Sequence, residues 1–187
     1  MATVLSAQCT DNRVNHVTKT ILYPKYRTPE DYVAVPRAEL EKDIHSCGTY
    51  RLKAKYIQGL CSIIITQHRG HVPQTMEELI ALPGVGRKTA AIILWACFGK
   101  SEGIAVDTHV FRVARRLGLV RGKTPEKVEA ELMRHLPRRQ WGKLTTLLIS
   151  HGRAVCTARN RRCDQCPFQK SCPSSWIMGR RDRGARG

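Results

Sequence analysis

The sequence predicts an all-α fold. Apolar residues recur at helical spacing along most of the chain, strand-like alternation is nearly absent, and turn residues fall between the helical segments. The 187 residues are enough for one or two small domains with a core of their own. A hydrophobic content of 42% is typical of a soluble globular chain and excludes a disordered one.

Three helices are expected before residue 71, each bounded by residues that start or stop a helix. They span residues 11–22, 36–46 and 51–68, with Asp11 and Pro36 at the first two starts and Pro24, Gly48 and Gly70 after the three ends. The third helix is expected to bury one face, formed by Tyr56, Ile57, Leu60, Ile64 and Ile65.

Five more helices are expected after residue 75, separated by a tight turn at 82–86 and a loop at 99–103. They span residues 76–81, 87–98, 107–117, 124–136 and 141–155. The third of these begins with Asp107 as its N-cap, and Gly118 ends it. The last helix is expected to place Leu144, Leu147, Leu148 and His151 on or near one face. Residues 176–187 are rich in Arg and Gly, which predicts a basic, disordered tail.

The charge balance points to a polyanionic partner. The chain has 32 Lys and Arg against 15 Asp and Glu, giving a formal net charge of +17. Such an excess favours nucleic acid as the partner, with an anionic membrane surface as the second candidate. The alternative is a surface that is charged only for solubility, but the repulsion among so many like charges would lower the stability of the fold. No apolar run is long enough to cross a bilayer, and the N-terminus lacks a signal-peptide pattern. We therefore expect an intracellular protein without a membrane partner.

Disulfides are rare in a reducing compartment, so the eight cysteines need another explanation. Four are scattered and are expected to be small buried hydrophobes: Cys9, Cys47, Cys61 and Cys97. The other four lie close together near the C-terminus: Cys156, Cys163, Cys166 and Cys172. Four thiolates at this spacing can surround one metal centre, and both zinc and a [4Fe–4S] cluster accept such ligands.

The loop between the first two clustered cysteines is basic, with Arg159, Arg161 and Arg162. A short, positively charged loop suits contacts with phosphate groups. We therefore count these three arginines among the candidate DNA-binding residues.

The turn at residues 82–90 is a second candidate for phosphate binding. A Gly-x-Gly turn lets the backbone adopt positive φ and approach a ligand closely, and the next helix directs unpaired N–H groups outward. The candidate contacts are Gly84, Val85, Gly86, Arg87 and Thr89. Lys88, one turn into that helix, is either a phosphate contact or a nucleophile, because the helix N-terminus and Arg87 both favour its neutral amine.

Asp107 precedes the predicted helix that ends at Leu117. A helix cap is the commonest role of an aspartate in this position, but its carboxylate is also able to stabilise positive charge on a sugar or to activate an amine or water. His109 is expected to be structural rather than catalytic, and it is kept among the candidate DNA contacts.

The turn at 82–90, the string Val106-Asp107-Thr108-His109 and the cysteine spacing together resemble the helix–hairpin–helix DNA glycosylases, and endonuclease III most of all. The match extends from Leu5 to Cys172. The resemblance implies a two-lobed fold: residues 10–118 form a helical bundle with the hairpin at about 76–98, and residues 1–9 and 119–175 form a lobe that holds a [4Fe–4S] cluster. Double-stranded DNA would be bound by a monomer.

The resemblance also assigns roles by position. Lys88 is similar to the family's Schiff-base nucleophile and Asp107 to its carboxylate partner, Gln8 matches the residue inserted into the stack left by a flipped base, and Thr49 replaces an apolar wedge. Met1 falls where family members are already inside their second helix, so we expect the first helix to be missing.

The implied activity is removal of damaged bases, with oxidised pyrimidines favoured, followed by β-elimination at the abasic site. Adenine glycosylases lack a lysine at the position of Lys88, and thymine glycosylases tend to lack it. Two alternatives stay open: a monofunctional glycosylase for T·G or A·G mismatches, and a non-catalytic iron–sulfur DNA-binding protein.

Overall fold

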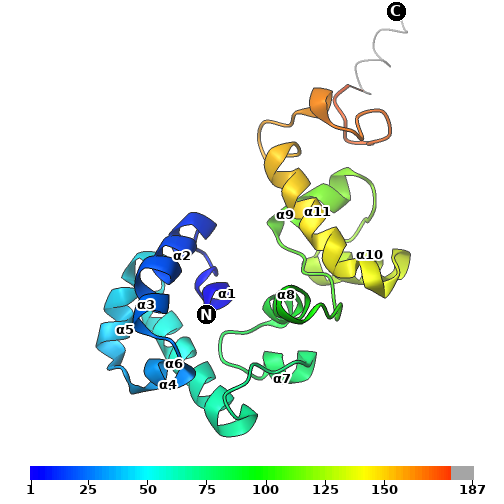
Figure 1. The fold of residues 1–187 in the computed structure, drawn as a ribbon. Helices are drawn as coiled ribbons and strands as arrows, with labels where there is room; N and C mark the ends of the chain where they lie inside the picture. Colours follow the sequence, from blue (N-terminus) through cyan, green and yellow to red (C-terminus); the bar gives the residue numbers. More distant parts are fainter. Residues whose placement is uncertain (178–187) are drawn as a thin grey trace, which may run out of the picture. The chain divides into compact units, whose positions relative to one another are not determined.

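The computed structural model describes residues 1–177, and over that range the regular structure is entirely helical, which confirms the all-α prediction (Figure 1). Most of the predicted tail, residues 178–187, lies outside the described part. None of the helices within residues 1–177 combines the length and the apolar character that crossing a bilayer requires.

The chain forms two compact units, Met1–Leu94 and Trp95–Gly187, and each is described here by itself. The division between them falls inside one long helix, α8. The predicted lobe boundaries, with residues 10–118 in one lobe and residues 1–9 and 119–175 in the other, stay a prediction.

The first unit contains most of the short helices. They are α1 (Ala2–Leu5), α2 (Asp11–Val17), the π-helical η1 (Thr18–Leu22), α3 (Tyr23–Lys25), α4 (Pro29–Ala34), α5 (Arg37–Asp43), the 3₁₀ turn η2 (His45–Cys47), α6 (Tyr50–His68), α7 (Met76–Ile80) and the first two-thirds of α8 (Arg87–Phe98). Helix α6, at 19 residues, is the centre of this unit, because α1, α4 and α5 all pack on it.

Helix α6 buries much of the predicted stripe. Ile57, Leu60 and Ile64 are buried, whereas Tyr56 and Ile65 are only half-buried. The helix ends as expected at His68, where the left-handed residue Arg69 (φ 54°) and then Gly70 (φ 80°) reverse the chain.

The first predicted helix differs from the structure at both ends. Its N-cap is Thr10 rather than Asp11, and the chain stays helical beyond Leu22, through η1 and α3, to Lys25. Pro24 does not stop the helix because it lies at the start of α3, directly after the π-helical η1, whose wider turn accommodates a residue without a backbone N–H.

Helix α4 was not predicted, although its start carries a recognisable signal. The side chain of Thr28 accepts from the N–H of Asp31, and the Asp31 carboxylate accepts from the N–H of Thr28 at 2.9 Å. This reciprocal capping box stabilises the start of a helix too short to show a clear apolar period.

The second unit is built on α9 (Thr108–Arg116), α10 (Pro125–His135) and α11 (Trp141–Ala154), with 3₁₀ turns η3 (Arg138–Gln140) and η4 (Cys163–Gln165). Helices α9 and α11 pack closely. The buried core is aliphatic throughout: Ile104, Val106, Val110, Val113, Ala114, Val120, Val128, Leu132 and Leu148. The side chains of Asp107 and Thr124 accept from backbone N–H groups three residues on, which confirms both predicted helix starts.

Leu147 was predicted to lie on or near one face with Leu144, Leu148 and His151, and in the structure it is 55% exposed. The buried face of α11 is formed by Gly142, Thr145, Leu148 and Gly152, whose spacing of three to four residues leaves position 147 outside. The expectation for the scattered cysteines is confirmed for Cys47 and Cys61, which are buried, but Cys9 is only half-buried and Cys97 is exposed in the last turn of α8.

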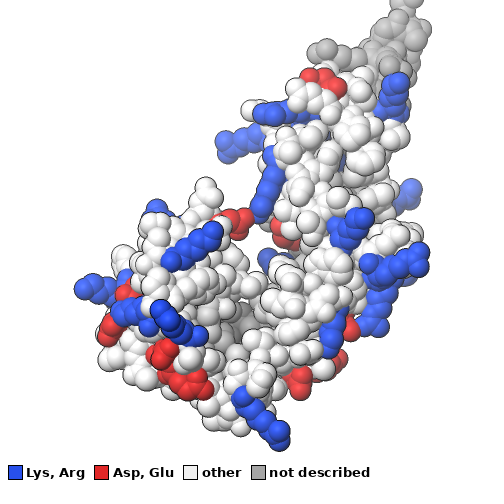
Figure 2. Space-filling model, viewed as in Figure 1, with Lys and Arg blue, Asp and Glu red and all other residues white. Residues whose placement is uncertain are grey.

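The positive charge is concentrated in the second unit. Lys and Arg number 12 against 8 Asp and Glu over residues 1–94, and 16 against 6 over residues 95–177. On the face drawn in Figure 2, several Asp and Glu side chains gather over α4 and α5. The electrostatic attraction for a polyanion is therefore strongest on the second unit.

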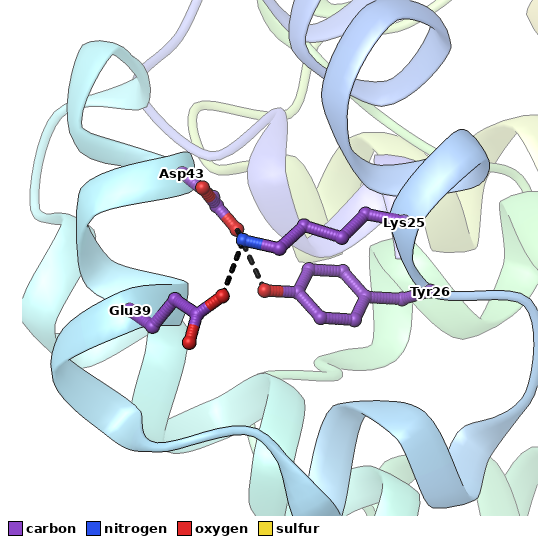
Figure 3. Close-up of polar contacts among 4 residues, drawn as sticks. All are labelled: Lys25, Tyr26, Glu39 and Asp43. Carbon is purple, nitrogen blue, oxygen red and sulfur yellow. Dashed lines mark hydrogen bonds and ion pairs between the residues drawn. The ribbon is translucent and has the colours of Figure 1, made fainter.

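A polar cluster ties α3 to α5 (Figure 3). Nζ of Lys25 lies 2.6 Å from Glu39 and 2.7 Å from Asp43, and the Tyr26 hydroxyl donates to the same Asp43 carboxylate at 2.6 Å. The Lys25 and Glu39 side chains are well exposed, so their ion pair contributes little by itself. The phenol is different, because burial and the hydrogen bond to Asp43 raise the pKa of Tyr26 to about 12.

This cluster predicts a loss of stability in alkaline solution. The folded protein raises the pKa of Tyr26 from 10.0 to about 12, so its contribution is fully present below about pH 10 and is lost as pH rises toward 12. Tyr26→Phe should cost about 1 kcal/mol at neutral pH, where the hydrogen bond is missing, and should then lose less stability than the parent between pH 10 and pH 12. Urea unfolding measures both changes. Tyr23→Phe, at a tyrosine that is 51% exposed, is the control, and the same alkaline loss in both variants would contradict the assignment.

Candidate functional site

The predicted hairpin is formed by α7, the turn at residues 82–86 and α8. The N–H of Val85 donates to the carbonyl of Leu82 at 3.1 Å, and Gly84 has a φ of 75°. A Cβ on Gly84 would lie 2.7 Å from the Tyr56 ring of α6, so glycine is required both for the backbone conformation and for packing on α6.

Gly86 behaves differently from Gly84. Its φ is not positive, and a Cβ built on it would meet nothing within 4 Å. The lack of a side chain at Gly86 therefore leaves open space in front of the start of α8, which is what close approach of a phosphate requires. Positive φ, expected for a Gly-x-Gly turn, is found at Gly84 alone of the two.

Lys88 is exposed at the second position of α8, close behind this open space. Arg87 is also exposed, Thr89 is half-buried, and Val85 is buried with 6% of its surface exposed. Val85 is therefore able to contact a ligand only through its backbone. The described geometry leaves the Lys88 amine accessible to a substrate.

Asp107 caps α9 in the second unit. Its Oδ1 accepts from the N–H of Val110 at 2.8 Å, and its backbone is extended, as an N-cap requires. The hydrogen bond fixes the direction of a half-buried carboxylate. Because Lys88 belongs to the first unit and Asp107 to the second, their convergence on one sugar stays a prediction.

Helix α9 also anchors the cysteine-rich loop. Arg112 donates to the carbonyl oxygens of Gly152 at 3.0 Å and of Cys156 at 3.1 Å, and its guanidinium lies 3.1 Å from Nδ1 of His109. His109 is half-buried and lies against Gly152 of α11, because a Cβ on that glycine would be 3.1 Å from the ring. This packing agrees with a structural role for His109, and a DNA contact by it stays a prediction.

The four clustered cysteines line one cavity, which is partly open to solvent. Arg116 NH1 lies 3.5 Å from the Cys156 sulfur, and the Cys172 thiol donates to the Arg116 carbonyl at 3.2 Å. His151 Nε2 lies 3.7 Å from the Cys166 sulfur. The sequence-predicted ligands are thus brought together around one space, with cationic and imidazole groups in its wall.

The donor set of this cavity fits a metal–sulfur group. Burial raises the pKa of the Cys166 thiol, and the charges of Cys172, Cys156 and Cys163 raise it further, so four bare thiolates are unfavourable together. A cationic centre would relieve that repulsion. Within residues 1–177, no group of three or more His, Cys, Asp or Glu side chains is arranged to hold a metal ion, so the fit rests on the chemistry of the lining residues.

The basic residues of the loop divide into two kinds. Arg161 is half-buried and donates to the carbonyl of Ser174 at 2.8 Å, which joins two parts of the cysteine-rich loop. Arg159 and Arg162 are exposed. Only these two have guanidinium groups fully available to a phosphate, although all three were counted as candidate contacts.

Gln8 and Thr49 are both exposed and both adopt left-handed backbone conformations, with φ of 53° and 38°. Sequence reasoning missed the residue that connects their loops, the buried Lys53, as well as Arg112 and Arg116. Lys53 could have been found, because it lies among the apolar positions of its helix. Nothing in the spacing of Arg112 and Arg116 distinguishes them from surface charges.

Comparisons with known proteins agree on one family. Residues 1–138 match the family described as "HhH-GPD superfamily base excision DNA repair protein". Endonuclease III of Bacillus subtilis is 51% identical over 92% of this chain and 78% of its own length. Endonuclease III of Synechocystis is 47% identical, over 94% and 80%, and that of Escherichia coli 41%, over 92% and 81%.

Solved structures give the same result. A non-covalent endonuclease III–DNA complex superposes with a TM-score of 0.88 at 47% identity, covering 96% of this chain and 83% of that one. A thermostable thymine-DNA glycosylase superposes with a TM-score of 0.79 at 25% identity, covering 93% and 81%. On the strength of the hairpin, the cysteine loop and these matches, the chain belongs to the helix–hairpin–helix superfamily of base excision DNA repair proteins and, within it, to the endonuclease III family.

Proposed function

We propose that this protein is a bifunctional DNA glycosylase and abasic-site lyase that removes oxidised pyrimidines from duplex DNA inside the cell. The observation that carries the proposal is the exposed amine of Lys88, placed at the start of α8 beside the open space in front of Gly86. A related structure with 47% identity is described as a trapped endonuclease III–DNA covalent intermediate, and a covalent intermediate requires a nucleophile of this kind.

In the proposed reaction, Nζ of Lys88 attacks C1′ of the deoxyribose. The C1′–N bond to the damaged base breaks, and the base leaves with the bonding electrons and takes up a proton. Opening of the sugar ring gives a Schiff base between Lys88 and C1′. Loss of a proton from C2′ then expels the 3′ phosphate by β-elimination, and water hydrolyses the Schiff base to release the enzyme.

Asp107 supplies the negative charge in this scheme. Positive charge develops on the sugar as the base departs, and a carboxylate held in a fixed direction stabilises it without reorganisation. The hydrogen bond from the Val110 N–H provides that fixed direction. The same carboxylate is able to accept a proton from the attacking amine.

The DNA is expected to bind through its phosphates to the hairpin and to the basic second unit. The backbone of Gly84–Gly86, the exposed Arg87 and the loop arginines Arg159 and Arg162 are the proposed contacts. A damaged base pairs and stacks less well than an intact one, so its extrusion from the duplex costs less free energy. Gln8 would occupy the gap that the extruded base leaves.

We further propose that Cys156, Cys163, Cys166 and Cys172 hold a [4Fe–4S] cluster rather than zinc. All four line one cavity, and the family to which the chain belongs is the ground for choosing iron. When bound, the cluster would cross-link a loop that is otherwise held by Arg112, Arg116 and Arg161. The rigid loop would then present its exposed arginines to phosphate groups.

The assignment of Lys88 predicts the behaviour of a trapped adduct. Borohydride reduces a Schiff base to a stable bond, so the parent should form a covalent adduct with duplexes that contain an oxidised pyrimidine or an abasic site. Lys88→Ala should abolish the adduct, and Asp107→Asn should slow its formation by about a hundredfold or more. Gel electrophoresis separates the adduct from free DNA.

The control is Lys55→Ala, which removes an exposed lysine from α6 of the same unit and should form the adduct at the parental rate. An adduct that persists in Lys88→Ala would rule out the nucleophile. Base release that leaves the strand intact until alkali is added would instead establish a monofunctional glycosylase, and a structurally similar protein is described as a thymine-DNA glycosylase. Salt-sensitive duplex binding without turnover would indicate a non-catalytic protein.

The cysteine assignment predicts the metal content. Purified parent protein should contain about four iron atoms per chain with inorganic sulfide and visible absorption, and Cys166→Ser should lose most of the iron. Cys97→Ser changes an exposed cysteine of the same unit and should retain it, which makes it the matched control. Elemental analysis that finds about one zinc atom in place of iron would overturn the cluster.

A further inference from the structure

Lys53 is the most buried charged residue of the described chain, with 3% of its surface exposed. Its ammonium donates to the carbonyl oxygen of Leu5 at 2.8 Å and to that of Cys47 at 2.6 Å. Both acceptors are neutral backbone groups. A buried ammonium is costly unless its donors are satisfied, so a lysine in this position implies that joining these two carbonyls matters.

The two carbonyls stand at the roots of two exposed loops. Leu5 ends α1, three residues before Gln8, and Cys47 ends η2, two residues before Thr49. The loops touch, because a Cβ on Gly48 would lie 4.0 Å from the carbonyl oxygen of Gln8. One side chain on α6 therefore fixes the spacing between a segment near the N-terminus and a segment more than 40 residues later.

Both loops hold strained backbone at their tips. Gln8 (φ 53°) and Thr49 (φ 38°) are non-glycine residues in the left-handed region, a conformation that side chains with a Cβ rarely adopt. Such conformations persist only where the surroundings hold them. The bonds from Lys53 to the carbonyls of Leu5 and Cys47 hold the segments from which both exposed tips extend.

We propose that Lys53 is a positioning residue that holds the Gln8 and Thr49 loops at a fixed spacing, so that both tips enter the duplex together where a base is extruded. This inference rests on the proposed function. Lys53 does not touch the DNA in this proposal. It keeps rigid the two loops that fill the gap left by the extruded base, and rigid groups lose less entropy on insertion than mobile ones.

The variant that tests the proposal is Lys53→Met, which keeps the length of the side chain and removes its donors. The matched control is Gln58→Leu on the same helix. Gln58 Nε2 also donates to two backbone carbonyls, those of Tyr32 and Val35, at 3.2 and 2.9 Å, but it joins α4 and not the two loops. Both variants remove a bridge between α6 and backbone carbonyls, so general destabilisation affects both.

The first measurement is the ratio of damaged-base excision to cleavage at a preformed abasic site. Each rate is normalised to the fraction of protein trapped by borohydride, so that unfolded molecules do not count. An abasic site has no base to extrude, so Lys53→Met should reduce the ratio by about tenfold while Gln58→Leu leaves it unchanged. Equal ratios in the parent and both variants, or an equal fall in both variants, would overturn the proposal.

The second measurement reports the loop spacing without any activity. Cys9 and Cys47 lie in these two loops, and burial together with the nearby Cys9 thiol raises the pKa of Cys47 to about 11. Brief treatment with diamide should join the pair, and mass spectrometry of the linked peptides over a range of pH gives the rate per thiolate, which corrects for the loss of the Lys53 charge that lowers the pKa of Cys47. Joining should be several-fold slower in Lys53→Met than in the parent or in Gln58→Leu. An unchanged rate would overturn the role of Lys53 in spacing.

The two measurements also separate the proposal from the function beneath it. A parent protein that forms no borohydride adduct, but whose loops join more slowly in Lys53→Met, would refute the lyase assignment and would leave Lys53 as a spacer of the two loops. A parent that forms the adduct, with a Lys53→Met variant of parental ratio, would refute the inference alone.

Discussion

The constraint on which the candidate sites depend is that carbonyl oxygens buried in irregular segments must find donors. Helix and sheet ladders satisfy their own carbonyls, but loops and helix ends do not. In this chain long cationic side chains on neighbouring helices supply the missing donors. Lys53 serves the ends of α1 and η2, while Arg112 and Arg116 serve the end of α11 and the chain that follows it, where the cysteine loop begins.

This use of cations changes how the net charge of +17 should be interpreted. Lys53, Arg112, Arg116 and Arg161 have their donors directed at the protein's own backbone, so their bonding capacity is not free for phosphate. Their charge still adds to the long-range attraction for a polyanion, because the carbonyls that they bond are neutral. Short-range contacts must come from exposed groups such as Lys88, Arg159 and Arg162.

The parts of the fold that could be predicted from the sequence are those controlled by nearest neighbours. The caps Asp107 and Thr124, the hairpin turn and the long helix α6 all follow from signals a few residues long. Helix α4 carries such a signal in Thr28 and Asp31 but lacks a period, and Pro24 was over-interpreted because its effect depends on its place in the helical turn.

Roles set by tertiary contact could not be predicted. Leu147 has the spacing of a buried residue, yet its exposure is decided by which face of α11 meets α9. Gly84 was expected to make room for a ligand, and the structure shows that it also makes room for Tyr56. Lys53 occupies an apolar position of α6, unlike Lys55 two positions along, but the two carbonyls that it joins belong to segments outside the helix and could not be predicted.

Asp107 illustrates how a structural requirement and a chemical one are met by one side chain. Capping by itself is satisfied almost equally by Asn, Ser or Asp, and an N-cap of this kind contributes about 1 kcal/mol. The cap therefore explains the direction of the side chain but not its charge. The charge adds a few tenths of a kcal/mol through the dipole of α9. Catalysis at a cationic sugar requires the charge itself, so an asparagine at this position should preserve the fold of α9 and remove the chemistry, a separation that alanine would not provide.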